Sequence, residues 1–408
     1  MASYSAAVAI FAILILLGTL QLISPSASLA QDLFNTPAHE LIEIAKDPKS
    51  DVRIMAIREL ARRPMSLDSI VPELARLSMD RDQRVLNAAQ VTLREIGESG
   101  AKMLRPLFDL QTRSASLAAC SATGSLGSSC EIYLPEIKQI LETGDRSQRH
   151  AALYALKGIG NSNVELLDEV IGSLSDKDFN VRLMACRVLE KYGPKASKAE
   201  PRLLELFERG TPSIRGYSAI CLASMGDKLQ VKGFAGKVAK RIEGKGARLE
   251  APTVHGRYLL ALTMLGEESS KKHLAVVRKG LGHHSIVVQI DSALAVCRIT
   301  GQTEESKAVF EKLLEDELKA PEALDHIIKF KDDAAPFVPA ILQSLDAASA
   351  LTREMAIVAL TELGINDAET SKKIEQKLED SEEDVRSAAK EALDFFEWQK
   401  RFSEGAQR

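Results

Sequence analysis

The chain has 408 residues, of which 45% are hydrophobic and 27% are charged, and its formal net charge is −4. This composition supplies enough apolar surface for a folded core and excludes a generally disordered chain. The small net charge conceals a segregation of positive and negative residues along the chain.

The first thirty residues contain no Asp, Glu, Lys or Arg. An unbroken apolar run from Ala6 to Leu17 is followed by Pro25 and by small residues at Ser28 and Ala30. This order predicts a secretory signal peptide over residues 1–30, cleaved before Gln31, and therefore a periplasmic or extracellular protein. The alternative is a membrane anchor retained in residues 1–23, although the strictly apolar run is shorter than the ~20 residues of a membrane span.

Beyond the signal, one short phrase recurs, as in FNVRLMACRVLEKYGP at residues 179–194 and DVRIMAIRELARRP at residues 51–64. From Val181 to Tyr192 the apolar residues follow the i, i+3, i+4, i+7 spacing of one helix face. Asn180 is the expected N-cap, and Gly193 and Pro194 are expected to end the helix. The phrase thus predicts an amphipathic helix, which we call helix B.

With the Val181 slot as position zero, the phrase starts at residues 52, 85, 148, 181, 214, 254, 289, 352 and 385. Position +12 is glycine in seven copies: Gly97, Gly160, Gly193, Gly226, Gly266, Gly301 and Gly364. Position −13 is proline in four copies, as expected in the first turn of a preceding helix A: Pro72, Pro135, Pro201 and Pro339. Each repeat is therefore expected to be a hairpin of helices A and B.

Two intervals of 63 residues, from 85 to 148 and from 289 to 352, each leave room for one further hairpin. TRSASLAACSATG, ending at Gly124, is the candidate for the first interval, and KAPEALDHIIKFK is the candidate for the second. The expected total is about eleven hairpins. Small residues at +4 and large residues at +8 would pack successive hairpins into one continuous core.

Charged residues also recur at fixed positions. Position +1 is arginine in six copies: Arg53, Arg149, Arg182, Arg215, Arg353 and Arg386. Acidic residues precede the phrase, near the turn between helices A and B: Asp47, Asp51, Asp145, Asp178 and Asp384.

The outline D-x-x-V-R-x-x-A-x-x-x-L-x-x-x-G resembles HEAT repeats of the short, bilin-lyase-like class over nearly all of residues 40–396. The resemblance implies an all-α fold, a right-handed α-solenoid of antiparallel hairpins. It also implies that the turn Asp and the helix-B Arg form a structural ladder between neighbouring repeats. The ladder is expected to be interrupted where the sequence departs from the outline, at Leu86, His255 and Ile290.

No catalytic or metal-binding motif is found. The HEAT-built deoxyhypusine hydroxylases carry several His-Glu pairs, whereas this chain has one, His39-Glu40. No G-x-S-x-G, H-E-x-x-H, G-x-x-x-x-G-K-[ST] or C-x-x-C pattern occurs. We therefore predict a non-catalytic protein without cofactor or metal. The alternative is an enzyme, or an enzyme accessory, of the bilin-lyase-like class.

Cysteine usage leaves two readings open. Export would permit a disulfide between Cys120 and Cys130, which we expect to lie across a loop. Five unpaired thiols, four of them inside helical phrases, are the other reading.

Charge is strongly polarised along the chain. Residues 228–284 hold twelve Lys and Arg against four Asp and Glu, a net of +8, whereas residues 302–408 hold fourteen against twenty-five, a net of −11. The basic stretch is a candidate surface for an acidic protein, an anionic lipid or a polyanionic glycan, and nucleic acid is disfavoured. Its candidate binding residues are Lys237, Lys240, Arg241, Lys271, Lys272, Arg278 and Lys279.

The sequence therefore predicts three segments: a signal peptide at 1–30, a HEAT-like solenoid at 31–396, and a C-terminal cap and tail at 397–408. In the last segment Trp398 and Phe402 continue a stripe that begins at Phe395. The predicted function is that of an exported scaffold that binds a protein or polyanion. A membrane-anchored structural adaptor is the remaining alternative.

Overall fold

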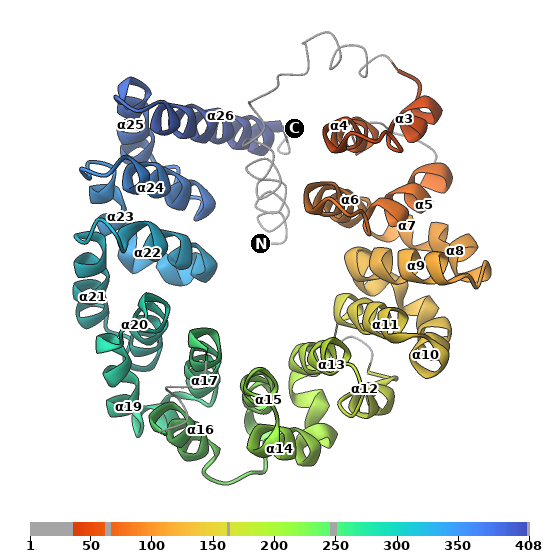
Figure 1. Cartoon of the computed structure of the whole chain (residues 1–408), viewed down its shortest axis with the longest axis horizontal. Helices are drawn as coiled ribbons and strands as arrows, with labels where there is room; N and C mark the ends of the chain where they lie inside the picture. Colours follow the sequence, from red (N-terminus) through yellow and green to blue (C-terminus); the bar gives the residue numbers. More distant parts are fainter. Residues whose placement is uncertain (1–35, 62–66, 161–163, 245–250, 406–408) are drawn as a thin grey trace. The chain divides into compact units, whose positions relative to one another are not determined.

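A computed structural model of the chain describes residues 36–61, 67–160, 164–244 and 251–405. Every regular element in these ranges is an α-helix or a 3-10 helix, so the all-α prediction is confirmed (Figure 1). The predicted signal peptide and anchor lie outside the described ranges. Within them, no helix is both long and apolar enough to cross a membrane.

The helices alternate between two layers along the chain (Figure 1). Within each unit A helices pack against the B helices that follow them, as α10 packs on α11 and α16 packs on α17. The A layer contains α3 (Ala38–Ile44), α5 (Leu67–Leu77), α8 (Arg105–Asp109), α10 (Leu134–Thr143), α12 (Leu167–Ser173), α14 (Glu200–Arg209), α16 (Phe234–Glu243), α19 (Leu274–Lys279), α21 (Glu304–Leu314), α23 (Val338–Ser344) and α25 (Ala368–Gln376). Short connecting helices include α7 (Glu98–Ala101), α18 (Glu267–Lys271), η2 (Gly127–Tyr133), η6 (Gly280–Gly282), η7 (Ile328–Phe337) and η8 (Lys377–Glu379).

The B layer contains the repeated phrase. Its members are α4 (Ser50–Ala61), α6 (Gln83–Ile96), α9 (Arg113–Leu126), α11 (Arg146–Ile159), α13 (Phe179–Tyr192), α15 (Pro212–Ser224), α17 (Pro252–Met264), α20 (Ile286–Thr300), α22 (Ala320–Ile327), α24 (Ala350–Glu362) and α26 (Glu383–Gly405). In the nine predicted copies, the helix starts two or three residues before position zero. The described ranges thus hold the eleven expected hairpins.

Glycine at position +12 ends a B helix by adopting the left-handed backbone region. All seven predicted glycines have positive φ, from 55° at Gly193 to 86° at Gly160. Side chains other than glycine are strained in this region, which explains why the position repeats so faithfully. The −13 prolines begin A helices at Pro135, Pro201 and Pro339, but Pro72 lies inside α5, which starts at Leu67.

The two degenerate hairpins adopt the same register as the others. Helix α9 does not end at Gly124 as predicted. It continues to Leu126, and Gly127 takes the positive-φ position with φ of 81°. In the second interval α22 is followed at the equivalent position by Lys331, a non-glycine residue with φ of 49°. Position zero in these hairpins is therefore residue 115 and residue 319.

The core forms between the two layers and between successive B helices. The +4 residues, such as Ala56, Ala152 and Ala356, are fully buried, and so are the +8 leucines Leu93 and Leu189. Two B helices approach each other closely at Gly158 of α11, where an added Cβ would lie 2.2 Å from the carbonyl oxygen of Gly124 in α9. Small residues at this crossing allow the backbones to meet.

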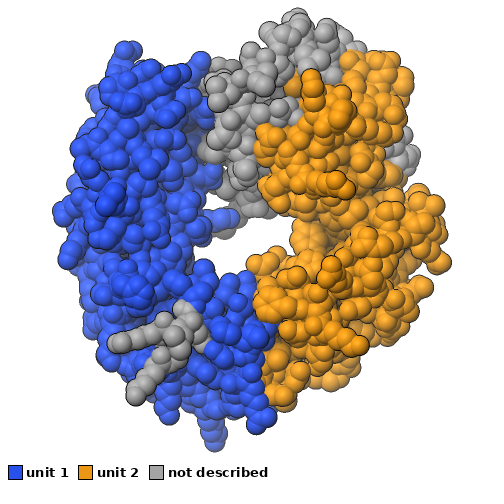
Figure 2. Space-filling model, viewed as in Figure 1, with its two compact units in different colours: residues 1–12, 207–226, 230–408 blue, residues 13–206, 227–229 orange. Residues whose placement is uncertain are grey.

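The chain divides into two compact units (Figure 2). Of the described residues, those within 36–206 and 227–229 form unit 2, and those within 207–226 and 230–405 form unit 1. Helix α26 runs from Glu383 to Gly405 without a break, across the boundary at 396 that we predicted for a C-terminal cap. Phe395 and Phe396 are buried, whereas the side chains of Trp398 and Phe402 lie outside the described part.

Candidate binding surfaces

Acidic and hydroxyl side chains at position −3 cap their own B helices. The carboxylate of Asp178, rather than the predicted Asn180, accepts hydrogen bonds from the backbone N–H groups of Asn180 and Val181, at 2.8 and 3.3 Å. Asp82, Asp145 and Ser349 cap α6, α11 and α24 in the same way. These side chains satisfy N–H groups that lack a partner at a helix start. These −3 side chains thus serve as helix caps.

The arginines at position +1 bind the turn of their own hairpin. In Arg53, Nη1 donates to the carbonyl oxygens of Asp47 and Pro48, at 2.9 and 3.0 Å. The other five predicted arginines contact the same turn carbonyls, as shown by Arg149 to Gly144, Arg182 to Asp176 and Lys177, Arg215 to Gly210, Arg353 to Ala347 and Ala348, and Arg386 to Asp380 and Ser381.

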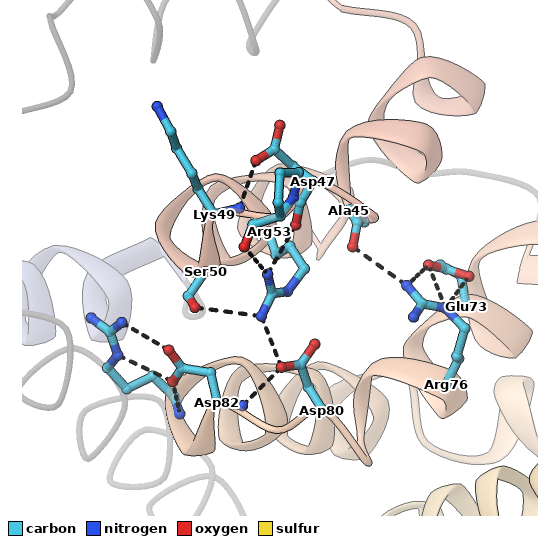
Figure 3. A network of polar contacts seen from close by, with 11 residues as sticks. Ala45, Asp47, Lys49, Ser50, Arg53, Glu73, Arg76, Asp80 and Asp82 are labelled. Atoms are coloured by element: carbon cyan, nitrogen blue, oxygen red, sulfur yellow. Dashed lines mark hydrogen bonds and ion pairs between the residues drawn. The ribbon is translucent and has the colours of Figure 1, made fainter.

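Three of these arginines also reach the next hairpin. Arg53 pairs with Asp80 at 2.8 Å (Figure 3). Arg149 pairs with Asp176 at 2.6 and 3.0 Å, and Arg353 pairs with Asp380 at 2.8 and 2.7 Å. The acceptors are at position −5, two residues before the Asp that the family outline singles out. The side chain of Asp51 lies outside the described part.

The −5 carboxylates are fixed from two sides. Besides the arginine, each accepts a backbone N–H two residues on, as in Asp82 N to Asp80 Oδ1 at 2.9 Å (Figure 3). The hydrogen bond from Arg353 lowers the pKa of Asp380, and the one from Arg149 lowers the pKa of Asp176. Asp80 and Asp380 are almost buried, at 12% and 7% exposure. The ladder therefore locks neighbouring hairpins in register.

Positions +2, +6 and +9 of two B helices, α11 and α13, form a partly exposed face on the side opposite the buried residues at +4 and +8. On α11 and α13 this face carries large side chains that are partly exposed: His150, Tyr154, Lys157, Leu183, Arg187 and Glu190. The Tyr154 ring lies against Gly124 of α9, where an added Cβ would meet it at 2.3 Å. Burial lowers the pKa of His150 and raises the pKa of Glu190, the latter against the opposing effect of Arg187.

Comparison with known proteins identifies the repeats. Residues 134–223, from α10 to α15, match the family model for HEAT repeats. Within residues 134–223 the hairpins are therefore HEAT repeats. A search of curated proteins finds no match. The bilin-lyase-like subclass remains a resemblance.

Two solved structures with low similarity cover most of the chain. One is an engineered protein, 17% identical over 88% of this chain and 98% of that chain, with a TM-score of 0.36. The other comes from work on a phosphorylation switch that controls the interaction between cadherin and β-catenin. It is 14% identical over 93% of this chain and 98% of that chain, with a TM-score of 0.36.

The predicted basic surface lies on the A side of the hairpins, and most of its charges are paired within the chain. Lys237 binds Glu208 of α14, Lys279 binds Glu243 of α16, and Arg278 binds Glu305 of α21. Lys271 and Lys272 pair with Glu267 and Glu268, and Arg241 donates to the carbonyl oxygens of Phe207 and Glu208. Lys240 is exposed. Several of these cations thus link neighbouring A helices. Of their partners, only Glu208 and Glu305 lie outside residues 228–284, so the segment keeps a net positive charge.

The structure holds Cys120 and Cys130 as free thiols. Cys120 is fully buried in α9, and Cys130 is buried in η2 rather than in the predicted loop. Burial raises the pKa of Cys120 to about 12 and that of Cys130 to about 11. Thiols of such high pKa are unreactive at neutral pH, so both act as small core residues.

One joint carries histidines where others carry the Arg–Asp pair. His255 takes position +1 on α17, and His283 and His284 take positions −6 and −5 before α20. The ring centroids of His255 and His283 are 5.6 Å apart, and those of His283 and His284 are 4.1 Å apart. Burial, followed by the proximity of His284, lowers the pKa of His283. Among the described residues no group of three His, Cys, Asp or Glu could hold a metal ion.

The sequence pattern singled out cations of the A layer and did not reveal the B-layer face of α11 and α13. The repeat register itself could have located this face, because positions +2, +6 and +9 point away from the apolar stripe. Its chemistry does not repeat from hairpin to hairpin, and a search for recurring residues therefore passes over it.

Proposed function

We propose that this protein is a non-catalytic scaffold that binds a protein partner on the partly exposed face of α11 and α13. The observation that carries the proposal is the group formed by His150, Tyr154 and Arg187, large side chains held partly exposed on adjacent helices. Tyr and Arg are enriched among the residues that dominate binding energy at protein interfaces.

Rigidity supports this choice of surface. The Arg149–Asp176 pair links the hairpin of α11 to the hairpin of α13, with both residues largely shielded from solvent. Glycines at the crossing of α9 and α11 bring these backbones into contact. A face whose helices are fixed in advance loses little conformational freedom on binding, and this favours affinity.

The test compares two variants of the tagged full-length protein, one altered on each candidate surface. One variant carries Tyr154→Ala and Arg187→Ala, and the other carries Lys237→Glu, Lys240→Glu, Lys271→Glu and Lys272→Glu. Partners recovered with the wild type are identified by mass spectrometry, and affinities for the purified partner are then measured. We expect the first variant to lose roughly 30-fold in affinity, equivalent to about 2 kcal/mol, and the second to bind as the wild type does.

Loss of the partner in the lysine variant alone would refute the proposal and would indicate that the basic surface binds the partner. Retention of full affinity in both variants would refute it as well. Melting curves of both variants serve as the control, because a binding loss is informative only where the fold is kept.

We further propose that residues 1–30 export the protein and are then removed. The absence of charge in this segment and its short apolar run support this.

A further inference from the structure

Exposed apolar side chains are concentrated at one edge of unit 1. Among the described residues of this unit, three large apolar side chains are exposed: Leu318 at 92%, Leu351 at 53% and Leu378 at 36%. They lie at or beside the A–B connections of the last three hairpins: Leu318 between α21 and α22, Leu351 in the first turn of α24, and Leu378 in η8 between α25 and α26. We call this set the leucine edge.

The turns that carry the leucine edge are neighbours in space (Figure 1). Helix α21 packs on α23, and α22 packs on α24, which in turn packs on α26. Lys377 of the last turn binds Asp346 of the turn before it at 2.7 Å, and Arg353 binds Asp380. The three leucines therefore follow one another along successive repeats.

The leucine edge is surrounded by negative charge. Exposed acids flank the leucines in all three turns: Glu315, Glu317, Asp346, Glu379, Glu382, Glu383 and Asp384. The nearby cations are already engaged, since Lys319 pairs with Asp316, Lys377 pairs with Asp346, and Arg353 and Arg386 bind turn carbonyls. Residues 302–408 as a whole carry a net charge of −11, from fourteen basic and twenty-five acidic residues.

We propose that the leucine edge binds a basic amphipathic helix of a partner protein. Burial of the exposed leucines under an apolar stripe stabilises the complex. The acidic side chains around them favour a positively charged segment over an acidic one. The spacing suits a helix, because packed neighbouring helices lie about 8–10 Å apart and seven residues of a helix rise roughly 10.5 Å. A partner with an apolar residue at every seventh position can place one on each turn.

This surface is separate from the face of α11 and α13, so the two proposals can fail independently. The probe is a fluorescent synthetic helix of about 20 residues with leucine at every seventh position and lysine on the other faces. A peptide of the same composition in permuted order and a peptide with glutamate in place of lysine are its comparators. Binding to the full chain is measured by fluorescence anisotropy.

We expect the basic amphipathic peptide to bind, the permuted and acidic peptides to bind at least ~10-fold more weakly, and binding to weaken as salt rises. Leu318→Ser combined with Leu351→Ser should reduce affinity ~10-fold or more. Leu110→Ser, which alters an equally exposed leucine of unit 2 at 62% exposure, should leave it unchanged. The Tyr154→Ala and Arg187→Ala variant should also bind the peptide normally.

Three outcomes would overturn the proposal. The first is equal binding of the permuted peptide, which would indicate charge attraction without a docking surface. The second is no binding of the basic amphipathic peptide. The third is a fall in the sedimentation coefficient of the protein itself on Leu318→Ser and Leu351→Ser substitution, which would show that a second copy of this chain covers the edge.

Discussion

At the scale of single residues, the ladder between repeats depends on buried ion pairs that also bind the backbone. Arg353 holds the Asp380 carboxylate and two carbonyl oxygens of its own turn. The pair is almost shielded from water, with exposures of 12% and 7%. In such a place, removing one partner is costly because the other charge is left buried and unpaired.

We expect Arg353→Ala to lower the free energy of unfolding by about 3 kcal/mol, as measured by urea denaturation. Asp380→Asn should also destabilise, and the double variant should lose less than the sum because the two residues interact directly. Lys240→Ala, at an exposed A-layer position, is the control and should have little effect. Strict additivity of the two ladder variants would contradict the assignment.

Lys331 is the residue that most clearly violates the repeat pattern. It occupies position +12 with φ of 49°, where seven predicted repeats use glycine. A left-handed conformation costs a non-glycine residue roughly 1–2 kcal/mol. Replacement by glycine removes this cost, but the greater freedom of glycine in the unfolded chain offsets part of the gain in stability. We expect Lys331→Gly to stabilise the protein by about 0.5–1 kcal/mol.

The reciprocal change provides the control for this expectation. Gly364 has φ of 71° and open space around its Cα, so an added Cβ meets no neighbour. Gly364→Ala should therefore destabilise by about 1 kcal/mol through the backbone alone. Equal thermal midpoints for Lys331→Gly and the wild type would show that no strain is stored at Lys331.

At the scale of elements, the packing of α9 on α11 depends on two glycines. Helix propensity alone predicts that Gly158→Ala stabilises α11 by up to about 1 kcal/mol. Because the new Cβ would lie 2.2 Å from the Gly124 carbonyl oxygen, we expect the opposite, a loss of roughly 1–3 kcal/mol from overpacking. Gly172→Ala in α12, where nothing lies within 4 Å, should be neutral or slightly stabilising. Chemical denaturation of both variants would contradict this if their effects had the same sign.

The joint between α17 and α20 gives a prediction about pH. Burial and the neighbouring His284 lower the pKa of His283, and the ring of His255 faces it from α17. An unfolded histidine takes up a proton near pH ~6.5, so the unfolded state binds more protons than the folded state below that pH. Stability contributed by neutral His283 is therefore present above pH ~6.5 and is lost as pH falls below it.

The measurement is the free energy of unfolding at pH 7.5 and at pH 5.5, chosen to bracket the ordinary pKa of ~6.5. We expect the wild type to lose more stability between the two than His283→Asn does. His39→Gln, which alters an exposed histidine, should behave as the wild type does. An identical decline in all three proteins would rule out a contribution from this joint.

Asp380 adds to stability in a different pH range. Because its pKa is lowered in the folded state, its contribution is present above pH ~3.9 and is lost as pH falls further.

At the scale of the whole molecule, the central expectation concerns maturation. The uncharged segment 1–30 is expected to be removed, which leaves Gln31 as the first residue of the exported protein. Intact mass spectrometry of the protein from the exported fraction should show this start. A chain that retains residues 1–23 and sediments with membranes would instead favour the anchored adaptor, and a cytoplasmic chain of full length would contradict export altogether.

The sequence by itself determined the class of fold and its register. Val at position zero, Ala at +4, Leu at +8 and Gly at +12 recur because each has a local physical cause, which is helix periodicity, close packing or a positive φ. The recurrence at position +1 likewise identified six arginines that bind the turns of their own hairpins. It failed at Gly124 and Lys331 because degenerate repeats keep the register of the backbone without keeping the residues that mark it.

Only the tertiary structure decided which charges meet. In the hairpin of α13 the ladder acceptor is Asp176 rather than Asp178, because the Asp178 side chain is turned back to cap its own helix. The cations at Lys237, Arg278 and Lys279 proved to link neighbouring A helices, since residues far apart in sequence become adjacent only when hairpins stack. For the same reason the face of α11 and α13 and the leucine edge could not be read from the chain, because each is assembled from successive repeats that sequence periodicity describes one at a time.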